Sequence, residues 1–188
     1  MDQFRQIIDT DSVLTDADWS QVTETVQLVS LNQGDSCGLF SGVDPMLGLV
    51  KSGFLKQSYT RENGRCYTIE LYKAGSFIGN YDEILSSERI ENTITPLTDT
   101  VLLAWKYSDL DRLFDSTPSF QKFARKITEF IFIRSETRLK QLLIYDAQER
   151  YEEFLKTFPE LVGIVKDYEV AAYLGITPVS LSRIKKKF

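Results

Sequence analysis

Four basic side chains near the end of the chain have the type and spacing to bind phosphate groups. They are Arg183 and Lys185 to Lys187, which follow the segment "YLGITPVSLS" with no acidic residue among them. Residues 166–188 carry a net charge of +3, whereas residues 1–165 carry −8. Because cations that neutralise phosphates release counterions, a basic tip on an acidic body predicts a local contact with a polyanion. The alternative is a tail that only increases solubility.

Other chemistry is limited by what the sequence lacks. The chain contains no histidine and two cysteines, Cys37 and Cys66. The absence of histidine excludes Ser-His-Asp and Cys-His catalysis and removes the commonest metal ligand. The sequence also has no P-loop, dinucleotide fingerprint or nucleophile elbow, and the carboxylates of "DAQERYEE" (146–153) predict a solvated helix face. We therefore expect no enzyme activity, no metal and no other cofactor.

The basic residues lie on the second of two predicted helices. Residues 168–175 predict a short helix, and Gly175 stands where a tight turn needs a positive φ. Thr177 is a strong N-cap for the next helix, in which Leu181 and Ile184 share a buried face. This order predicts a helix-turn-helix, a motif that places its second helix in the major groove of DNA. The alternative is a simple corner between two helices with a basic end.

Upstream of these helices, residues 25–106 predict strands. Short runs rich in Val, Ile, Leu, Tyr and Thr alternate with turn signals such as "RENGR" (61–65), whose Asn-Gly pair favours a hairpin. Many short strands at this spacing predict an antiparallel β-barrel or jelly roll. Residues 15–24 predict a short helix capped by Thr15 or Asp16, and residues 107–116 predict another helix.

A long helix is predicted over residues 118–145, which contain no glycine and no proline after Pro118. Its apolar residues occur on most of its circumference, namely Phe120, Phe123, Ile127, Phe130, Ile131, Phe132, Ile133, Leu139, Leu142 and Leu143. A helix that is apolar on two faces needs two partners, so we expect a homodimer formed through this helix. The alternative is a helix enclosed by its own chain. Residues 146–158 predict a further amphipathic helix.

This order of elements resembles the Crp–Fnr family of bacterial transcription regulators. The segments "SLNQGD", "GLVKSGFLKQSYTRENGR" and "YKAGSFIGN", with Gly34, Gly53 and Gly75 at turns, and the tail "YLGITPVSLSRIKKK" are similar to the family's pattern. The resemblance implies an α+β fold and a homodimer that binds double-stranded DNA. It implies a barrel sensor domain (1–117) that takes a small-molecule effector, a dimerisation helix (118–145) and a helical DNA-binding domain (146–188).

The resemblance also implies site residues. Base-reading positions of the family fall on Pro178, Val179 and Arg183, and only Arg183 can pair with guanine O6 and N7. The expected DNA-binding residues are Thr177, Pro178, Val179, Ser180, Ser182, Arg183, Lys186 and Lys187.

The expected effector pocket departs from the family's pattern. Members that bind cyclic AMP have a Gly-Glu pair and, about ten residues on, an arginine that neutralises the cyclic phosphate. Here Gly79 is followed by Asn80, and Ile90 and Glu91 occupy the basic pair's positions, with Arg89 one residue early. We expect a pocket that has changed its ligand or lost it, unless a one-residue slip brings Arg89 to the phosphate.

Two other classes of protein compete with a DNA-binding regulator. One is a sensor or protein-interaction module whose helix-turn-helix does not bind DNA. The other is a cupin-like metalloenzyme, which normally needs clustered histidines. No apolar run approaches the roughly 20 residues that span a bilayer, and "MDQFRQIIDTDSV" has no signal-peptide pattern. We therefore expect a cytoplasmic protein with no membrane partner.

Overall fold

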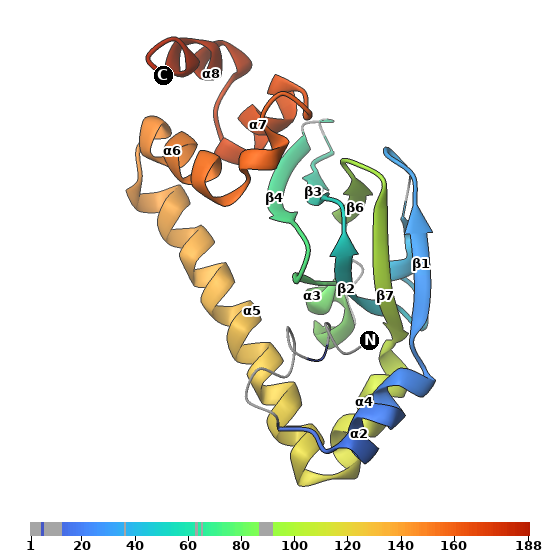
Figure 1. Cartoon of the computed structure of the whole chain (residues 1–188). Helices are drawn as coiled ribbons and strands as arrows, with labels where there is room; N and C mark the ends of the chain where they lie inside the picture. The colour runs from blue at the N-terminus through green and yellow to red at the C-terminus, as the bar shows by residue number, and fades with distance from the viewer. Residues whose placement is uncertain (1–4, 6–12, 36, 63, 65, 87–91) are drawn as a thin grey trace.

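A computed structural model describes residue 5 and residues 13–35, 37–62, 64, 66–86 and 92–188 (Figure 1). Its elements are, in chain order, α2 (Asp16–Glu24), β1 (Gln27–Leu31), η1 (Gly38–Phe40), β2 (Met46–Ser52), β3 (Leu55–Thr60), β4 (Cys66–Tyr72), β5 (Phe77–Ile78), α3 (Tyr81–Ser86), β6 (Asn92–Pro96), β7 (Thr100–Lys106), α4 (Tyr107–Ser116), α5 (Pro118–Ile144), α6 (Ala147–Thr157), η2 (Pro159–Leu161), α7 (Asp167–Leu174) and α8 (Pro178–Lys185).

The strands form two antiparallel sheets. One sheet has the order β1-β7-β2-β5 and the other has the order β4-β3-β6. Val50 and Leu102 from the first sheet and Leu55 and Ile94 from the second are buried in one cluster, so the sheets share a core. The predicted antiparallel β unit is confirmed. A closed barrel is not confirmed, because the described strands pair only within each of the two sheets.

Four elements of the β unit were not predicted from the sequence: η1, β5, α3 and β6. β5 has two residues and α3 has six, which is too short for a periodic pattern. β6 is the segment "NTITP", whose polar Asn92 is buried along with Ile94. The predicted turn at Gly53 is confirmed. Its φ is 89°, and a Cβ there would lie 2.4 Å from Oγ1 of Thr100, so a side chain does not fit.

The helices at the start of the chain and after β7 begin where capping chemistry predicts. Thr15 and Asp18 form a reciprocal capping box at α2. Oγ1 of Thr117 accepts a hydrogen bond of 3.3 Å from the backbone N–H of Phe120, and Pro118 occupies the first turn of α5. From this end α5 runs the length of the β unit to the C-terminal helices (Figure 1).

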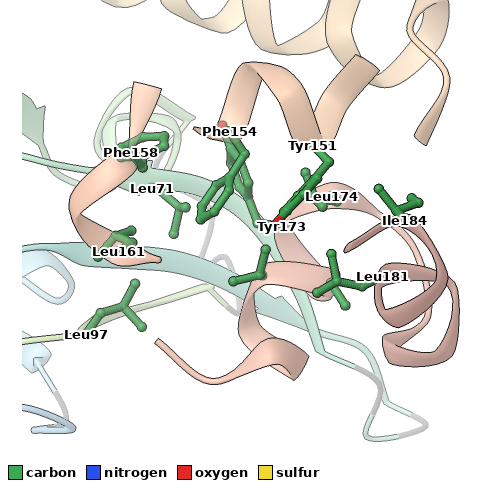
Figure 2. Close-up of a cluster of buried hydrophobic side chains, with 12 residues drawn as sticks. Leu71, Leu97, Tyr151, Phe154, Phe158, Leu161, Tyr173, Leu174, Leu181 and Ile184 are labelled. Carbon is green, nitrogen blue, oxygen red and sulfur yellow. The ribbon is translucent and has the colours of Figure 1, made fainter. Parts of the chain in front are cut away.

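The C-terminal helices pack on the β unit through a shared hydrophobic cluster (Figure 2). Leu71 of β4 and Leu97, which follows β6, are buried with side chains of α6, η2, α7 and α8. The members from the C-terminal helices are Tyr151, Phe154, Phe158, Leu161, Val170, Ala171, Tyr173, Leu174, Leu181 and Ile184. No spacer therefore separates the C-terminal helices from the sheets.

Much of the apolar surface of α5 faces away from the described chain. Phe132 is 63% exposed and Leu143 is 75% exposed, whereas Phe120 and Phe123 are buried against the β unit. The alternative that α5 is enclosed by its own chain is therefore wrong for the described residues. Homodimerisation through this helix stays a prediction. Among the helices that the structure describes, none is long and apolar enough to cross a membrane.

Candidate nucleic-acid interface and effector site

Helix α8 is held by one face and presents the other to solvent. Leu181 and Ile184 are buried among α6 and α7. Gly175 takes the left-handed conformation with φ of 68° and ends α7, as the sequence predicts. Oγ1 of Thr177 then accepts a hydrogen bond of 3.1 Å from the backbone N–H of Ser180, which caps α8. The expected local order of helix, glycine turn and capped helix is confirmed.

The predicted DNA-binding residues lie together on this exposed face. Pro178, Val179, Ser182 and Arg183 are exposed on α8, and Lys186 and Lys187 are exposed directly after it. In the part of the chain that the structure describes, no carboxylate pairs with Arg183, Lys186 or Lys187. Their charges are therefore available to an external anion.

Lys185 differs from its basic neighbours because it forms an ion pair with Asp167 at the start of α7. Residues 18 apart in sequence come together here only because α7 and α8 pack side by side. Sequence reasoning did not find this pair. It reduces the charge that the tail offers to phosphates from four cations to three.

The Asn80 side chain, at the position of the family's ribose-binding carboxylate, is used inside the protein. Asn80 is 1% exposed. Its Nδ2 donates to Oγ of Ser41 at 2.7 Å, and its Oδ1 accepts from Nε2 of Gln57 at 3.4 Å. Tyr72 Oη donates in turn to Oε1 of Gln57 at 2.6 Å, and burial raises the pKa of this tyrosine. The structure thus places Asn80 in a buried hydrogen-bond chain.

Of the other predicted pocket residues, Gly79 is described by the structure and the remaining three are not. Gly79 lines a cavity next to Leu47, and a Cβ on this glycine would lie 2.4 Å from Cδ2 of Leu47. Arg89, Ile90 and Glu91 lie outside the described residues. The predicted effector site is therefore described only at its Gly79-Asn80 end.

A cavity of about 340 Å³ lies between α5 and the sheets. Most of its wall is apolar and includes Phe77, Trp105, Phe123 and Ile127. Its polar wall groups belong chiefly to Gln57, Glu70, Arg134, Ser135 and Arg138. Sequence reasoning missed the two arginines because an arginine on a long helix is usually exposed.

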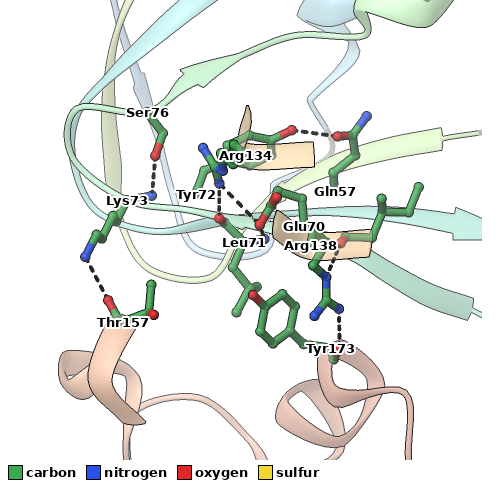
Figure 3. A network of polar contacts seen from close by, with 11 residues as sticks. Gln57, Glu70, Leu71, Tyr72, Lys73, Ser76, Arg134, Arg138, Thr157 and Tyr173 are labelled. Atoms are coloured by element: carbon green, nitrogen blue, oxygen red, sulfur yellow. Dashed lines mark hydrogen bonds and ion pairs between the residues drawn. The ribbon is translucent and has the colours of Figure 1, made fainter. Parts of the chain in front are cut away.

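Arg134 and Arg138 connect α5 to β4, and Arg138 also reaches α7 (Figure 3). Arg134 donates to the backbone carbonyl of Leu71 and lies 3.3 Å from Oε1 of Glu70. Arg138 donates through Nε to the carbonyl of Ile69 at 3.0 Å, and through Nη2 to the carbonyl of Tyr173. One guanidinium therefore ties α5, β4 and α7 together.

Two further polar contacts hold the C-terminal helices to the sheets. Nζ of Lys56 lies 2.7 Å from Oε2 of Glu169 in α7, and both side chains are mostly buried. Nζ of Lys73 donates to the carbonyl of Thr157 at 2.7 Å (Figure 3). The positions of α6 and α7 relative to the β unit are thus fixed by polar contacts as well as by apolar packing.

Solved structures with the same architecture include several bacterial transcription regulators. A proposed Crp/Fnr-family regulator from Eubacterium rectale has a TM-score of 0.71 and 18% identity, with 94% of this chain and 84% of that chain covered. FixK2 from Bradyrhizobium japonicum has a TM-score of 0.69 and 18% identity, with 86% and 83% covered. The protein has the fold of the Crp–Fnr regulators.

A third structure with the Crp–Fnr fold is CLP of Xanthomonas campestris, a global regulator that responds to c-di-GMP. It has a TM-score of 0.66 and 18% identity, and the match covers 92% of this chain and 91% of that chain. No family model matches the chain, and neither does any curated protein. The Crp–Fnr likeness is therefore one of architecture, whereas function has to be argued from the residues of this chain.

The arrangement of the described side chains does not support the alternative of a metalloenzyme. Across the described ranges, no group of three or more Cys, Asp or Glu side chains is placed to hold a metal ion. Several neighbours with this fold are transcription regulators, a class of protein that generally has no enzyme activity.

Proposed function

We propose that the protein is a homodimeric, DNA-binding transcription regulator whose cyclic-nucleotide pocket is altered or lost. The observation that carries the proposal is the exposed face of α8. It presents a capped helix N-terminus at Thr177 and three cations, Arg183, Lys186 and Lys187, without ion pairs in the described chain. The Crp–Fnr fold supports the proposal, because neighbours that share it are transcription regulators.

In this function α8 enters the major groove. Its N-terminal residues Thr177 and Ser180 meet phosphates, where hydroxyl groups and the positive end of the helix dipole are favourable. Arg183 reads guanine through O6 and N7, and Val179, which is exposed, contacts a thymine methyl group. Residues 1–117 serve as the sensor, 118–145 as the dimerisation helix and 146–188 as the DNA-binding domain.

Selection of bound sequences from a random duplex pool, at two salt concentrations, tests this function. We expect enrichment of a motif with twofold symmetry, because a symmetric dimer presents two copies of α8 to two half-sites. We also expect binding to weaken as salt rises, because bound phosphates release counterions. A pool without enrichment, together with binding that salt does not affect, would favour the interaction module that does not bind DNA.

Arg183→Ala and Lys186→Ala should impair DNA binding in different ways. Loss of Arg183 should relax the preference at one base pair, at a cost of roughly 1–3 kcal/mol on the best duplex. Loss of Lys186 should weaken all duplexes alike and lower the slope of affinity against salt by up to about one. Titration of selected and scrambled duplexes at several salt concentrations measures both effects.

Lys51→Ala is the control for that titration, because Lys51 is an exposed cation of β2. It should leave the affinity and the salt slope unchanged. If Arg183→Ala and Lys186→Ala behave like this control on the best selected duplex, α8 is not the DNA-reading element.

Cyclic AMP should not bind in the mode usual for the family. That mode uses a carboxylate for the ribose hydroxyl, and here the buried Asn80 side chain already bonds Ser41 and Gln57. A neutral amide also binds a hydroxyl less strongly than a carboxylate does. The sequence has Ile90 where the family has its arginine, so that position would supply no counter-charge to an anionic phosphate taken out of water, at a cost of several kcal/mol.

Calorimetry with millimolar cyclic AMP and cyclic GMP measures this directly. We expect no dissociation constant below about 1 mM. A dissociation constant near or below about 10 µM that Arg89→Ala abolishes would show that Arg89 takes the place of the missing arginine, and the expectation would be wrong.

A further inference from the structure

The cavity between α5 and the sheets has the size and lining of a small-molecule site. Its volume of about 340 Å³ corresponds to about eleven water molecules at roughly 30 Å³ each, which is within the usual range for ligand pockets. Along α5, the lining residues from Phe123 to Ile131 are apolar, and Arg134 and Arg138 follow them. The cavity therefore combines an apolar chamber with a cationic wall.

Arg138 is the unusual group in this wall, because it is buried without an anionic partner. Its exposed fraction is 7%, and its acceptors are the neutral backbone carbonyls of Ile69 and Tyr173. Its guanidinium also lies 3.9 Å from the centre of the Tyr173 ring. No carboxylate among the described residues forms an ion pair with it. Burial accordingly lowers the pKa of Arg138, since the charged form is poorly solvated.

The neighbouring charges leave this wall positive. Glu70 attracts Arg138 at a distance but pairs with Arg134, at 3.3 Å. Arg150 adds a further positive charge nearby. Because a buried charge is costly without a counter-charge, an anion in the cavity would stabilise Arg138 more than any neutral ligand could.

We propose that this cavity binds a small monocarboxylate with an apolar body, and that its carboxylate pairs with Arg138. The apolar walls match an alkyl or aryl chain of about ten non-hydrogen atoms. They offer few partners for the many polar atoms of a nucleotide. Gly79 also lines this cavity, so the site is the described end of the expected effector pocket, extended along α5, and its ligand is of another class than a cyclic nucleotide. Its regulatory meaning rests on the proposed function, whereas the binding itself does not.

Ligand binding would act on the DNA-binding helices through Arg138. The carboxylate competes with the carbonyl of Tyr173 for the same guanidinium, and Tyr173 belongs to α7. Occupancy therefore loosens the hydrogen bond by which α5 holds α7. Hydrogen exchange of the amides of residues 167–174 should become faster when the site is filled.

Calorimetry on the full chain with octanoate, octanol and octylamine tests the proposal, because the three probes share one chain length and differ in charge. We expect octanoate to bind at least about tenfold more tightly than octanol, and octylamine to bind most weakly. Arg138→Gln should remove the advantage of octanoate over octanol and leave octanol unchanged.

Arg125→Gln is the matched control, since Arg125 is an exposed arginine of α5 that pairs with Glu129 and does not line the cavity. It should leave all three affinities unchanged. If Arg138→Gln does not fold, Ala124→Phe supplies the second test. Ala124 lines the cavity, so a larger side chain there should abolish binding of octanoate and octanol while the Arg138 contacts stay intact.

Equal affinities for octanoate and octanol, or no binding of either at millimolar concentration, would overturn the proposal. Octanoate binding that survives both Arg138→Gln and Ala124→Phe would place the ligand elsewhere and would also overturn it. The duplex selection is independent of these results. Octanoate binding without DNA binding would reject the proposed function alone, and DNA binding without octanoate binding would reject this site alone.

Discussion

Replacing Phe154 by alanine should lower the free energy of unfolding by about 3–5 kcal/mol, the usual cost of removing a buried phenylalanine. Phe154 is 3% exposed and lies at the centre of the shared cluster (Figure 2). Its ring centre is 6.3 Å from that of Tyr151, 6.0 Å from that of Phe158 and 6.1 Å from that of Tyr173. Truncation would leave a cavity that these rigid rings cannot fill. Urea unfolding followed by far-UV circular dichroism measures the change.

The control for this variant is Val179→Ala, because Val179 is 62% exposed on α8. It should change stability by less than about 0.5 kcal/mol. We also expect tryptophan fluorescence to report the same transition as circular dichroism, since Trp19 and Trp105 lie in the β unit's own core. A Phe154→Ala protein with a lowered dichroism midpoint and an unchanged fluorescence midpoint would show that the C-terminal helices unfold separately.

Leu143→Glu should raise the dissociation constant of the proposed homodimer by about a hundredfold or more. Phe132, Leu139 and Leu143 are exposed, and their spacings of seven and four residues place them on one stripe of α5. Burying a leucine contributes about 1.5–3 kcal/mol, and each 1.4 kcal/mol is a factor of ten in affinity. A glutamate loses that contribution and brings a charge to the interface from both subunits.

Sedimentation equilibrium over a range of protein concentrations measures this effect. Lys140→Glu is the control, because Lys140 is exposed on the same helix and lies outside the apolar stripe. It should change the dissociation constant by less than about threefold. A wild-type protein that stays monomeric at tens of micromolar would contradict the proposed dimer, whatever the variants do.

The sequence was informative where local chemistry decides the structure. The absence of glycine and proline after Pro118 predicted α5, and Gly175 with Thr177 predicted the turn between α7 and α8. These features depend on backbone conformation and capping, which act within a few residues. They position the exposed face of α8, so this part of the candidate site followed from sequence.

Contacts between distant residues could not be predicted in the same way. Lys56 and Glu169 are 113 residues apart, and Arg138 and Ile69 are 69 apart. Nothing in a single sequence shows that either pair meets. The cavity and its cationic wall depend on how α5 lies across the sheets, so they became visible only in three dimensions. β6 was missed because its sequence, "NTITP", contains the polar Asn92 at a position that tertiary packing buries. The alternation of buried and exposed residues therefore does not show as an alternation of apolar and polar residues.

The cluster shared by the sheets and the C-terminal helices limits how this chain could recombine in evolution. A segment of 43 residues, 146–188, is close to the size at which a domain no longer folds alone, and its core is completed by Leu71 and Leu97. A new pair of helices could not simply be joined after α5, because it would need side chains that fit those two leucines. If the proposed function holds, a change of DNA specificity is therefore more accessible by substitution on the outer face of α8 than by exchange of the whole segment.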